Sequence, residues 1–127
     1  EAGARRVLPL PVSAPFHCPL MAPVQPRLDG VLSGVSMGEP SIPVVANVDA
    51  AANRDASRIQ GLLVEQVCAP VRWVDCVQTL SAQGADELLE LGPGRAIAGM
   101  VRRIDKELPT TSLGTADQIT AYLEAHS

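Results

Sequence analysis

Apolar residues recur along this chain at two spacings, one typical of helices and one typical of strands. Short, nearly unbroken apolar runs predict strands over residues 42–48 (IPVVANV) and 87–91 (ELLEL). Runs of this kind are typical of strands buried on both faces of a parallel sheet. Two further strands are expected, one over residues 6–12, where prolines favour an edge position, and one over residues 110–113.

Between these strands, apolar residues at helical spacing predict helices. Pro19 suits the first turn of the first helix, Asp55 can cap the second, and the last helix is expected to start at Thr115. The apolar stripes of the first four predicted helices are, in order, Met21, Val24, Leu28, Val31 and Leu32; Ile59, Leu62, Leu63, Gln66 and Val67; Val74, Val77 and Leu80; and Ile97, Met100, Val101 and Ile104. Strands separated by helices predict an α/β fold with a parallel sheet.

Composition narrows the classes of protein that this chain can represent. With 127 residues, 46% of them apolar, the chain is long enough for one modest domain or for a piece of a larger one. Its three aromatic residues are too few for a platform that stacks single-stranded nucleic acid, and a net charge of −4 argues against nucleic acid in general. No apolar run approaches the ~20 residues of a membrane helix, so no membrane partner is expected.

The cysteines indicate the compartment and bear on metal binding. Cys18, Cys68 and Cys76 are odd in number and lack the spacing of a zinc site. An odd count without a secretory leader favours a reducing environment. We therefore expect a cytoplasmic protein without a bound metal.

Two glycine-containing segments are candidates for chemistry. Residues 34–38 (GVSMG) formally match the G-x-S-x-G nucleophile elbow, but a helix precedes them and a strand follows, which reverses the order that the elbow requires. We interpret this segment as a loop. Residues 92–94 (GPG) lead from a strand into a helix, whose N-terminus could hold a phosphate. The segment matches neither the phosphate-loop nor the dinucleotide template, which favours a tight structural turn.

His17 stands between a predicted strand and a predicted helix, where α/β proteins often carry functional loop residues. Histidine is the side chain best suited to acid–base chemistry near neutral pH. The residues alone leave a purely structural histidine open. They also leave open a Cys18 nucleophile with His17 as its base, although neighbours in sequence seldom face each other.

Four segments resemble the signatures of one family, in the right order, over about residues 4–106. The first is residues 9–21 (PLPVSAPFHCPLM), and the second is residues 43–49 (PVVANVD). The third joins Gln66 to residues 70–73 (PVRW), and the last contains residues 90–95 (ELGPGR). Together they resemble the bacterial malonyl-CoA:acyl carrier protein transacylases.

The resemblance implies an enzyme of fatty acid biosynthesis, an [acyl-carrier-protein] S-malonyltransferase. Such an enzyme moves malonyl from coenzyme A to the phosphopantetheine thiol of acyl carrier protein through a seryl acyl-enzyme, without a cofactor. His17 would be the general base and then the acid, and the main-chain carbonyl of Gln66 would accept the imidazole N–H. Phe16 would lie beside the acyl pocket and favour malonyl, with packing in the core as the alternative. Asn47 is a further expected substrate contact.

The chain departs from the family at one large point. The G-H-S-x-G nucleophile, the Arg that binds the malonyl carboxylate and the oxyanion-hole Gln have no counterpart in it, and its first residue is Glu1 rather than Met. We therefore expect the C-terminal part of a longer, monomeric enzyme, inactive without the N-terminal part that carries the Ser. Residues 1–12 would end a ferredoxin-like small subdomain. Residues 13–127 would form the C-terminal portion of an α/β-hydrolase-like core.

Two other functions are compatible with the same residues. The chain could come from the acyltransferase domain of a polyketide synthase, which uses the same chemistry. It could also be a non-catalytic remnant that acts only as a binding module. The tail after Lys106 carries no signature that separates these hypotheses.

Overall fold

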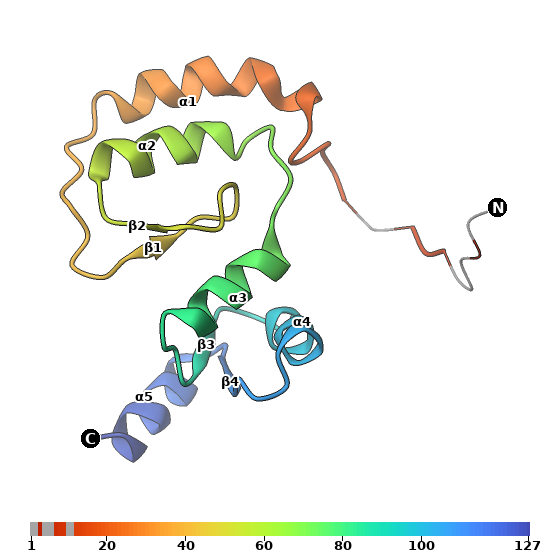
Figure 1. Ribbon diagram of the computed structural model, residues 1–127, viewed down its shortest axis with the longest axis vertical. Helices are drawn as coiled ribbons and strands as arrows, with labels where there is room; N and C mark the ends of the chain where they lie inside the picture. Colours follow the sequence, from red (N-terminus) through yellow and green to blue (C-terminus); the bar gives the residue numbers. More distant parts are fainter. Residues whose placement is uncertain (1–2, 4–6, 10–11) are drawn as a thin grey trace.

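The computed structural model describes residue 3, residues 7–9 and residues 12–127. Its elements form two groups along the chain, with α1, α2, β1 and β2 in the first and α3, α4, α5, β3 and β4 in the second (Figure 1). The elements are the 3-10 helix η1 (Pro19–Val24), α1 (Gln25–Leu32), β1 (Val44–Val45), β2 (Ala52–Asn53), α2 (Ala56–Glu65), α3 (Trp73–Ala82), β3 (Leu88–Leu91), α4 (Ala96–Ile104), β4 (Thr110–Leu113) and α5 (Ala116–Ala125). No helix in the part of the chain that the structure describes is long and apolar enough to cross a membrane.

Helices α2 and α5 begin where the capping residues Asp55 and Thr115 predicted, so both predictions are confirmed. The Asp55 carboxylate accepts hydrogen bonds from the main-chain N–H groups of Ser57 and Arg58, at 2.7 and 3.0 Å, and so satisfies donors that have no partner inside α2. A third bond, from the Ser57 hydroxyl, is the largest cause that lowers the pKa of Asp55. Thr115 caps α5 by accepting from the N–H of Gln118, at 3.3 Å.

The hydrophobic core of the second group joins α3 and α4 to the chain between α4 and β4. Val77 and Val101 are fully buried, and Leu108 is nearly so. The side chains that pack against these three are Trp73, Leu88, Ile97 and Ile104. Met100, predicted on the inner face of α4, is 41% exposed, so that assignment is wrong. The other three predicted positions, Ile97, Val101 and Ile104, do belong to this core or pack against it, and Met100 is turned about 100° from Val101.

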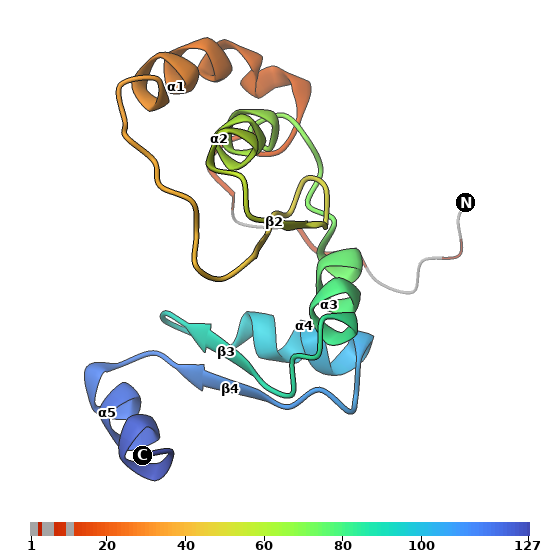
Figure 2. The same cartoon turned by 60° about the vertical axis from the view of Figure 1, so that its left-hand side comes forward.

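The strands form two separate sheets rather than one. β3 and β4 pair in parallel, from Leu88 opposite Thr110 to Leu91 opposite Leu113, which confirms the parallel arrangement for this pair. Figures 1 and 2 both show these two strands lying between α4 and α5. β1 and β2 pair antiparallel, so the prediction of a single parallel sheet is wrong. Only a short connection separates β1 from β2, whereas a parallel pair requires a long crossover.

Two predicted strands are less buried than their apolar runs suggested. The run over residues 42–48 contributes only β1, and Ile42 and Val44 are 74% and 41% exposed. In β3, Leu89 and Leu91 are exposed at 41% and 69%. Burial on both faces is therefore wrong for both strands. Each has one neighbouring strand among the described residues, and apolar side chains of each remain open to solvent.

The strand predicted over residues 6–12 lies partly outside the described residues. Residues 7–9 and 12 are described and belong to no strand, while residues 6, 10 and 11 lie outside. The expected ferredoxin-like subdomain over residues 1–12 falls on the same segment and stays a prediction.

Candidate functional site

His17 lies in the turn that leads into η1, and its backbone conformation is unusual. Its φ of 57° is in the left-handed region, which costs a residue other than glycine about 1–3 kcal/mol. Pro15 and Pro19 restrict the chain on either side, and Pro19 occupies the first turn of η1. The turn holds His17 on the surface, where its imidazole is exposed.

The structure brings His17 together with Gln66. The Nδ1 atom of His17 lies 3.0 Å from the main-chain oxygen of Gln66, which is the C-cap residue of α2. Carbonyls in the last turn of a helix have no partner within it and are free to accept. A carbonyl oxygen can only accept, so Nδ1 is the donor in this contact, and in the neutral imidazole Nε2 then keeps its lone pair.

A second side chain holds the same turn of α2. The Nε2 atom of Gln25, at the start of α1, donates to the main-chain oxygen of Val64 at 3.0 Å. Helices α1 and α2 lie side by side (Figure 1). Two of the carbonyls that end α2, those of Val64 and Gln66, are therefore bonded to side chains from the segment that contains His17. This connection fixes the acceptor of His17 relative to α1.

The other two predicted substrate contacts lie in different places. Phe16 precedes His17 and is 57% exposed, so it does not pack in the core of the described chain. Asn47 follows β1 and lines a hollow of about 200 Å³ together with Gln66 and apolar side chains of β1 and α2. Its main-chain oxygen accepts from the N–H of Arg72 at 2.8 Å. Neither Phe16 nor His17 lines this hollow, so Asn47 adjoins the acceptor of His17 rather than the imidazole.

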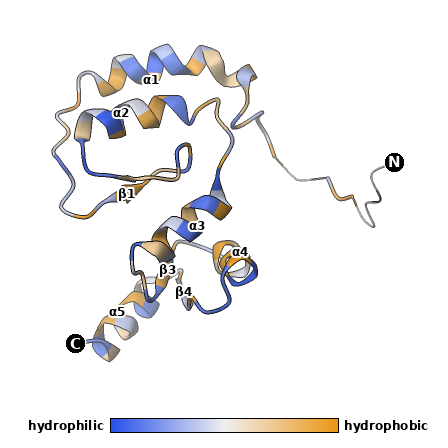
Figure 3. Ribbon diagram, viewed as in Figure 1, coloured by the Kyte–Doolittle hydropathy of each residue, from blue (hydrophilic) through white to orange (hydrophobic). Residues whose placement is uncertain are grey.

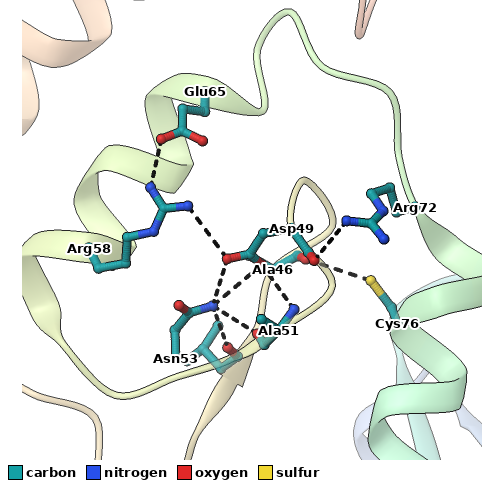
Figure 4. Close-up of polar contacts among 9 residues, drawn as sticks. Ala46, Asp49, Ala51, Asn53, Arg58, Glu65, Arg72 and Cys76 are labelled. Carbon is teal, nitrogen blue, oxygen red and sulfur yellow. Dashed lines mark hydrogen bonds and ion pairs between the residues drawn. The ribbon is translucent and has the colours of Figure 1, made fainter.

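The turn after Asn47 is held by a polar network around Asp49 (Figure 4). The Asp49 carboxylate accepts from the N–H of Ala51 at 3.0 Å and from the side-chain amide of Asn53 at 3.3 and 3.4 Å. It also pairs with Arg58 at 3.7 Å, and Arg72 donates to the Asp49 main-chain oxygen at 3.0 Å. Asp49 and Arg72 lie within the family segments at residues 43–49 and 70–73, but no spacing signal in the sequence connects them.

The thiols next to these residues do not point to a cysteine nucleophile. The Sγ of Cys18 donates to the main-chain oxygen of Pro15 at 3.1 Å, so the hydrogen-bond partner of this thiol is a carbonyl and not His17. Cys76 is buried beside Ala46 and Asn47, and burial is the largest cause that raises the pKa of its thiol. Among the described residues, no group of three or more His, Cys, Asp or Glu side chains could hold a metal ion.

The two glycine segments are structural in the described chain. Residues 34–38 lie in the loop that follows α1, and Ser36 belongs to no helix or strand, so the strand–turn–helix of a nucleophile elbow is absent around it. At the start of α4, the Glu90 carboxylate accepts from the N–H groups of Ile97 and Ala98, at 2.9 and 3.1 Å. An internal carboxylate thus occupies the donors that a phosphate would need.

The surroundings of Glu90 favour its charged form. Burial alone would raise the pKa of this carboxyl group, and it is the largest single effect. The two bonds from α4, a third from the Ser112 hydroxyl at 2.8 Å and the charge of Arg95 act in the opposite direction and together lower the pKa. Glu90 therefore joins β3, β4 and the first turn of α4 as an ionised group.

Known proteins of one kind are similar to this chain. No family model matches the chain. In sequence, the chain is 41% identical over 122 residues to the malonyl CoA-acyl carrier protein transacylase of Salmonella typhimurium and 40% identical over 123 residues to that of Escherichia coli. These matches cover 96% and 97% of the chain but 40% of each relative, so the chain spans about two fifths of their length.

Solved structures give the same result. An acyl carrier protein S-malonyltransferase from Vibrio cholerae superposes with a TM-score of 0.87 at 42% identity, over 95% of this chain and 40% of that one. A malonyl-transacylase in complex with a type II PKS acyl-carrier protein gives 0.87 at 44% identity, over 97% and 40%. The resemblance to the malonyl-CoA:acyl carrier protein transacylases is confirmed, and nearly the whole chain is similar to a part of their α/β fold.

Proposed function

We propose that this chain provides the general base of an [acyl-carrier-protein] S-malonyltransferase. The observation that supports the proposal is the 3.0 Å contact between His17 Nδ1 and the Gln66 carbonyl, which leaves Nε2 as a proton acceptor. In serine acyltransfer the hydroxyl is a weak nucleophile until an adjacent base accepts its proton. A base whose other nitrogen is held by a fixed acceptor keeps the tautomer that this step requires.

The proposed reaction runs in two half-reactions. The Ser oxygen forms a bond to the malonyl thioester carbonyl while its proton passes to Nε2 of His17, and the C–S bond then breaks as His17 returns that proton to the coenzyme A thiolate. In the second half, His17 takes the proton of the phosphopantetheine thiol, whose sulfur attacks the seryl ester, and returns it to the Ser oxygen. Every group that moves belongs to the protein or to a substrate, so the proposal requires no cofactor.

The nucleophile itself is assigned to polypeptide outside this chain. Ser36 is the one serine in a G-x-S-x-G match, and it lies in a loop after α1. The relatives are about two and a half times as long as the segment they share with this chain, which leaves room for an N-terminal part with the Ser. On this view residues 1–12 end the small ferredoxin-like subdomain, residues 13–127 belong to the hydrolase-like core, and the assembled enzyme is monomeric.

The proposed partners are malonyl-CoA and acyl carrier protein. Support for the carrier comes from the similar transacylase that was solved in complex with its acyl-carrier protein. That carrier belongs to a type II PKS, which keeps polyketide synthesis beside fatty acid synthesis as the pathway. The three free cysteines agree with a reducing cytoplasm as the proposed compartment.

A chimaera tests the proposal. In it, this chain replaces the segment that it matches in the Salmonella typhimurium relative, so that a complete Ser-containing half is present. We expect the chimaera to transfer labelled malonyl from coenzyme A to acyl carrier protein and the isolated chain to transfer none. Cys18→Ala in the chimaera is the matched control for a thiol nucleophile and should leave transfer intact. Stable label on the isolated chain, or a folded chimaera without transfer, would contradict the proposal.

A further inference from the structure

One face of α4 borders a hollow that the proposed reaction does not use. We call it the α4 hollow; its volume is about 490 Å³, and Arg95, Gly99, Arg102, Lys106, Leu108 and Thr110 are among the residues that line it. Gly99 and Arg102 are three residues apart and share one face of α4, and Arg95 directly precedes the helix as its N-cap residue. The chain then turns after Ile104 and brings Lys106 to the same hollow. Cavities of this size are typical of sites for small molecules.

The charge of the α4 hollow is opposite to that of the chain. Three cations line it and no acidic residue does, although the net charge of the whole chain is −4. Figure 3 shows hydrophilic colouring where α4 ends and along the loop that follows. The ion pairs among the described residues involve Arg58 and Arg72, and none of them includes Arg95, Arg102 or Lys106. All three cations are exposed and form none of these ion pairs, although Arg95 lies close enough to Glu90 to help lower the pKa of that carboxyl group.

Two of the nearby acidic side chains, Glu90 and Asp105, have partners of their own. Glu90 accepts from two N–H groups of α4 and from Ser112. Asp105, beside Lys106 in the chain, accepts from the Ser81 hydroxyl at 3.1 Å and from the N–H of Glu107 at 3.0 Å. The first donors of α4 are thus occupied, so an anion in the hollow would contact the basic side chains and not the start of the helix.

We propose that the α4 hollow binds the phosphate group of a phosphorylated ligand. An arginine presents a planar fork of donors that matches phosphate oxygens in pairs, and a lysine adds a point charge. The buried Leu108 is one of the residues that line the hollow. A Cβ atom at position 99 would meet no other atom within 4 Å, so there is open space beside the backbone of α4 at Gly99. The choice of ligand rests on the proposed function, because both of its substrates, coenzyme A thioesters and phosphopantetheinylated carrier protein, carry phosphate esters.

The test measures binding to the isolated chain by calorimetry and by NMR shifts of α4, and so requires no transfer activity. Coenzyme A and phosphopantetheine are the probes, pantetheine is the control without phosphate, and inorganic pyrophosphate is the competitor. We expect pyrophosphate to displace the bound probe and pantetheine not to bind. If coenzyme A alone binds, its nucleotide phosphates are the source recognised; if both probes bind equally, it is the phosphate that they share.

Matched variants locate the site. Arg102→Glu should weaken probe binding at least about tenfold, because it replaces a charge-assisted donor by a repelling charge. Arg103→Glu changes the net charge equally on the neighbouring residue, which does not line the hollow, and should change binding less than about threefold. Gly99→Leu should also weaken binding, since it fills the hollow while favouring the helix.

Three results would overturn the proposal: no binding of either probe, equal binding of pantetheine, or equal loss in Arg102→Glu and Arg103→Glu. Binding to the isolated chain is measured apart from transfer in the chimaera, so failure of this site is distinguished from failure of the proposed function.

Discussion

The imidazole Nδ1 of His17 lies 3.0 Å from the main-chain oxygen of Gln66, a residue 49 positions further along the chain. The partner is a backbone atom, so the side chain at position 66 is not part of the contact. Because the acceptor belongs to the end of α2, the orientation of His17 depends on where that helix stops.

This relationship predicts an asymmetry between two substitutions in the chimaera. His17→Ala should lower kcat by about 10²–10⁴, the usual contribution of a positioned base. Gln66→Ala keeps the main-chain acceptor and should lower kcat only slightly. Steady-state transfer of malonyl to acyl carrier protein measures both. Equal damage by the two substitutions would show that the Gln66 side chain takes part in the chemistry.

The exposed ring of Phe16 predicts a change in acyl selectivity. Phe16→Ser should improve the use of methylmalonyl-CoA relative to malonyl-CoA in the chimaera, because a ring beside the acyl group would crowd the extra methyl. One methyl group corresponds to about 1–3 kcal/mol, so the ratio of the two kcat/KM values should shift by about 10–200-fold at most. Leu20→Ser, at another exposed apolar residue of the same segment, is the control. An unchanged ratio in Phe16→Ser would remove Phe16 from the pocket.

Burial separates two valines of the same size by their effect on stability. Val101 is fully buried between α3 and α4, and Val101→Ala should lower the free energy of unfolding by about 2 kcal/mol. Val31, on α1, is 66% exposed, and Val31→Ala should change the same quantity by less than about 0.5 kcal/mol. Urea unfolding followed by the fluorescence of Trp73, which packs on the core, measures both. Similar losses would mean that this core does not control unfolding.

The lowered pKa of Glu90 predicts how stability depends on acid. Because the folded state favours the carboxylate, Glu90 stabilises the fold above the ordinary pKa of 4.5, and this contribution is lost as the pH falls through the lower value of the folded state. Glu90→Gln should therefore reduce stability at pH 7 and flatten its dependence on pH below 4.5. Urea midpoints at several pH values provide the measurement, with Glu39→Gln as an exposed control. Parallel pH profiles of wild type and Glu90→Gln would contradict the role of Glu90.

Local signals predicted most of the elements. Asp55 and Thr115 marked helix starts because a cap acts within three residues, and residues 110–113 matched β4 at both ends. The apolar run over residues 42–48 predicted burial on both faces, and this was wrong. An apolar pattern indicates that a segment favours burial, but it does not indicate whether this chain contains the layers that would cover it. There the neighbours include one short strand, α2 and α3, and only Val44–Val45 pairs.

The site was less accessible to sequence reasoning. The pair His17 and Gln66 came from family resemblance, since no pattern in the chain connects residues 49 positions apart through a main-chain atom. The network of Asp49, Arg58 and Arg72 stayed unrecognised for the same reason, because two of its bonds end on backbone groups. Any residue type can provide a main-chain atom for such a contact, so the sequence carries no signal at that position.

The parallel pair of β3 and β4 has a consequence for how this chain behaves at high concentration. In the described residues each strand is paired along one edge, and Leu89 and Leu91 remain exposed on β3. An unprotected strand edge with leucines beside it is a template for the backbone of another molecule. Purified chain should therefore self-associate through β3 into oligomers that grow with concentration, and a lysine in place of Leu91 should keep it dispersed.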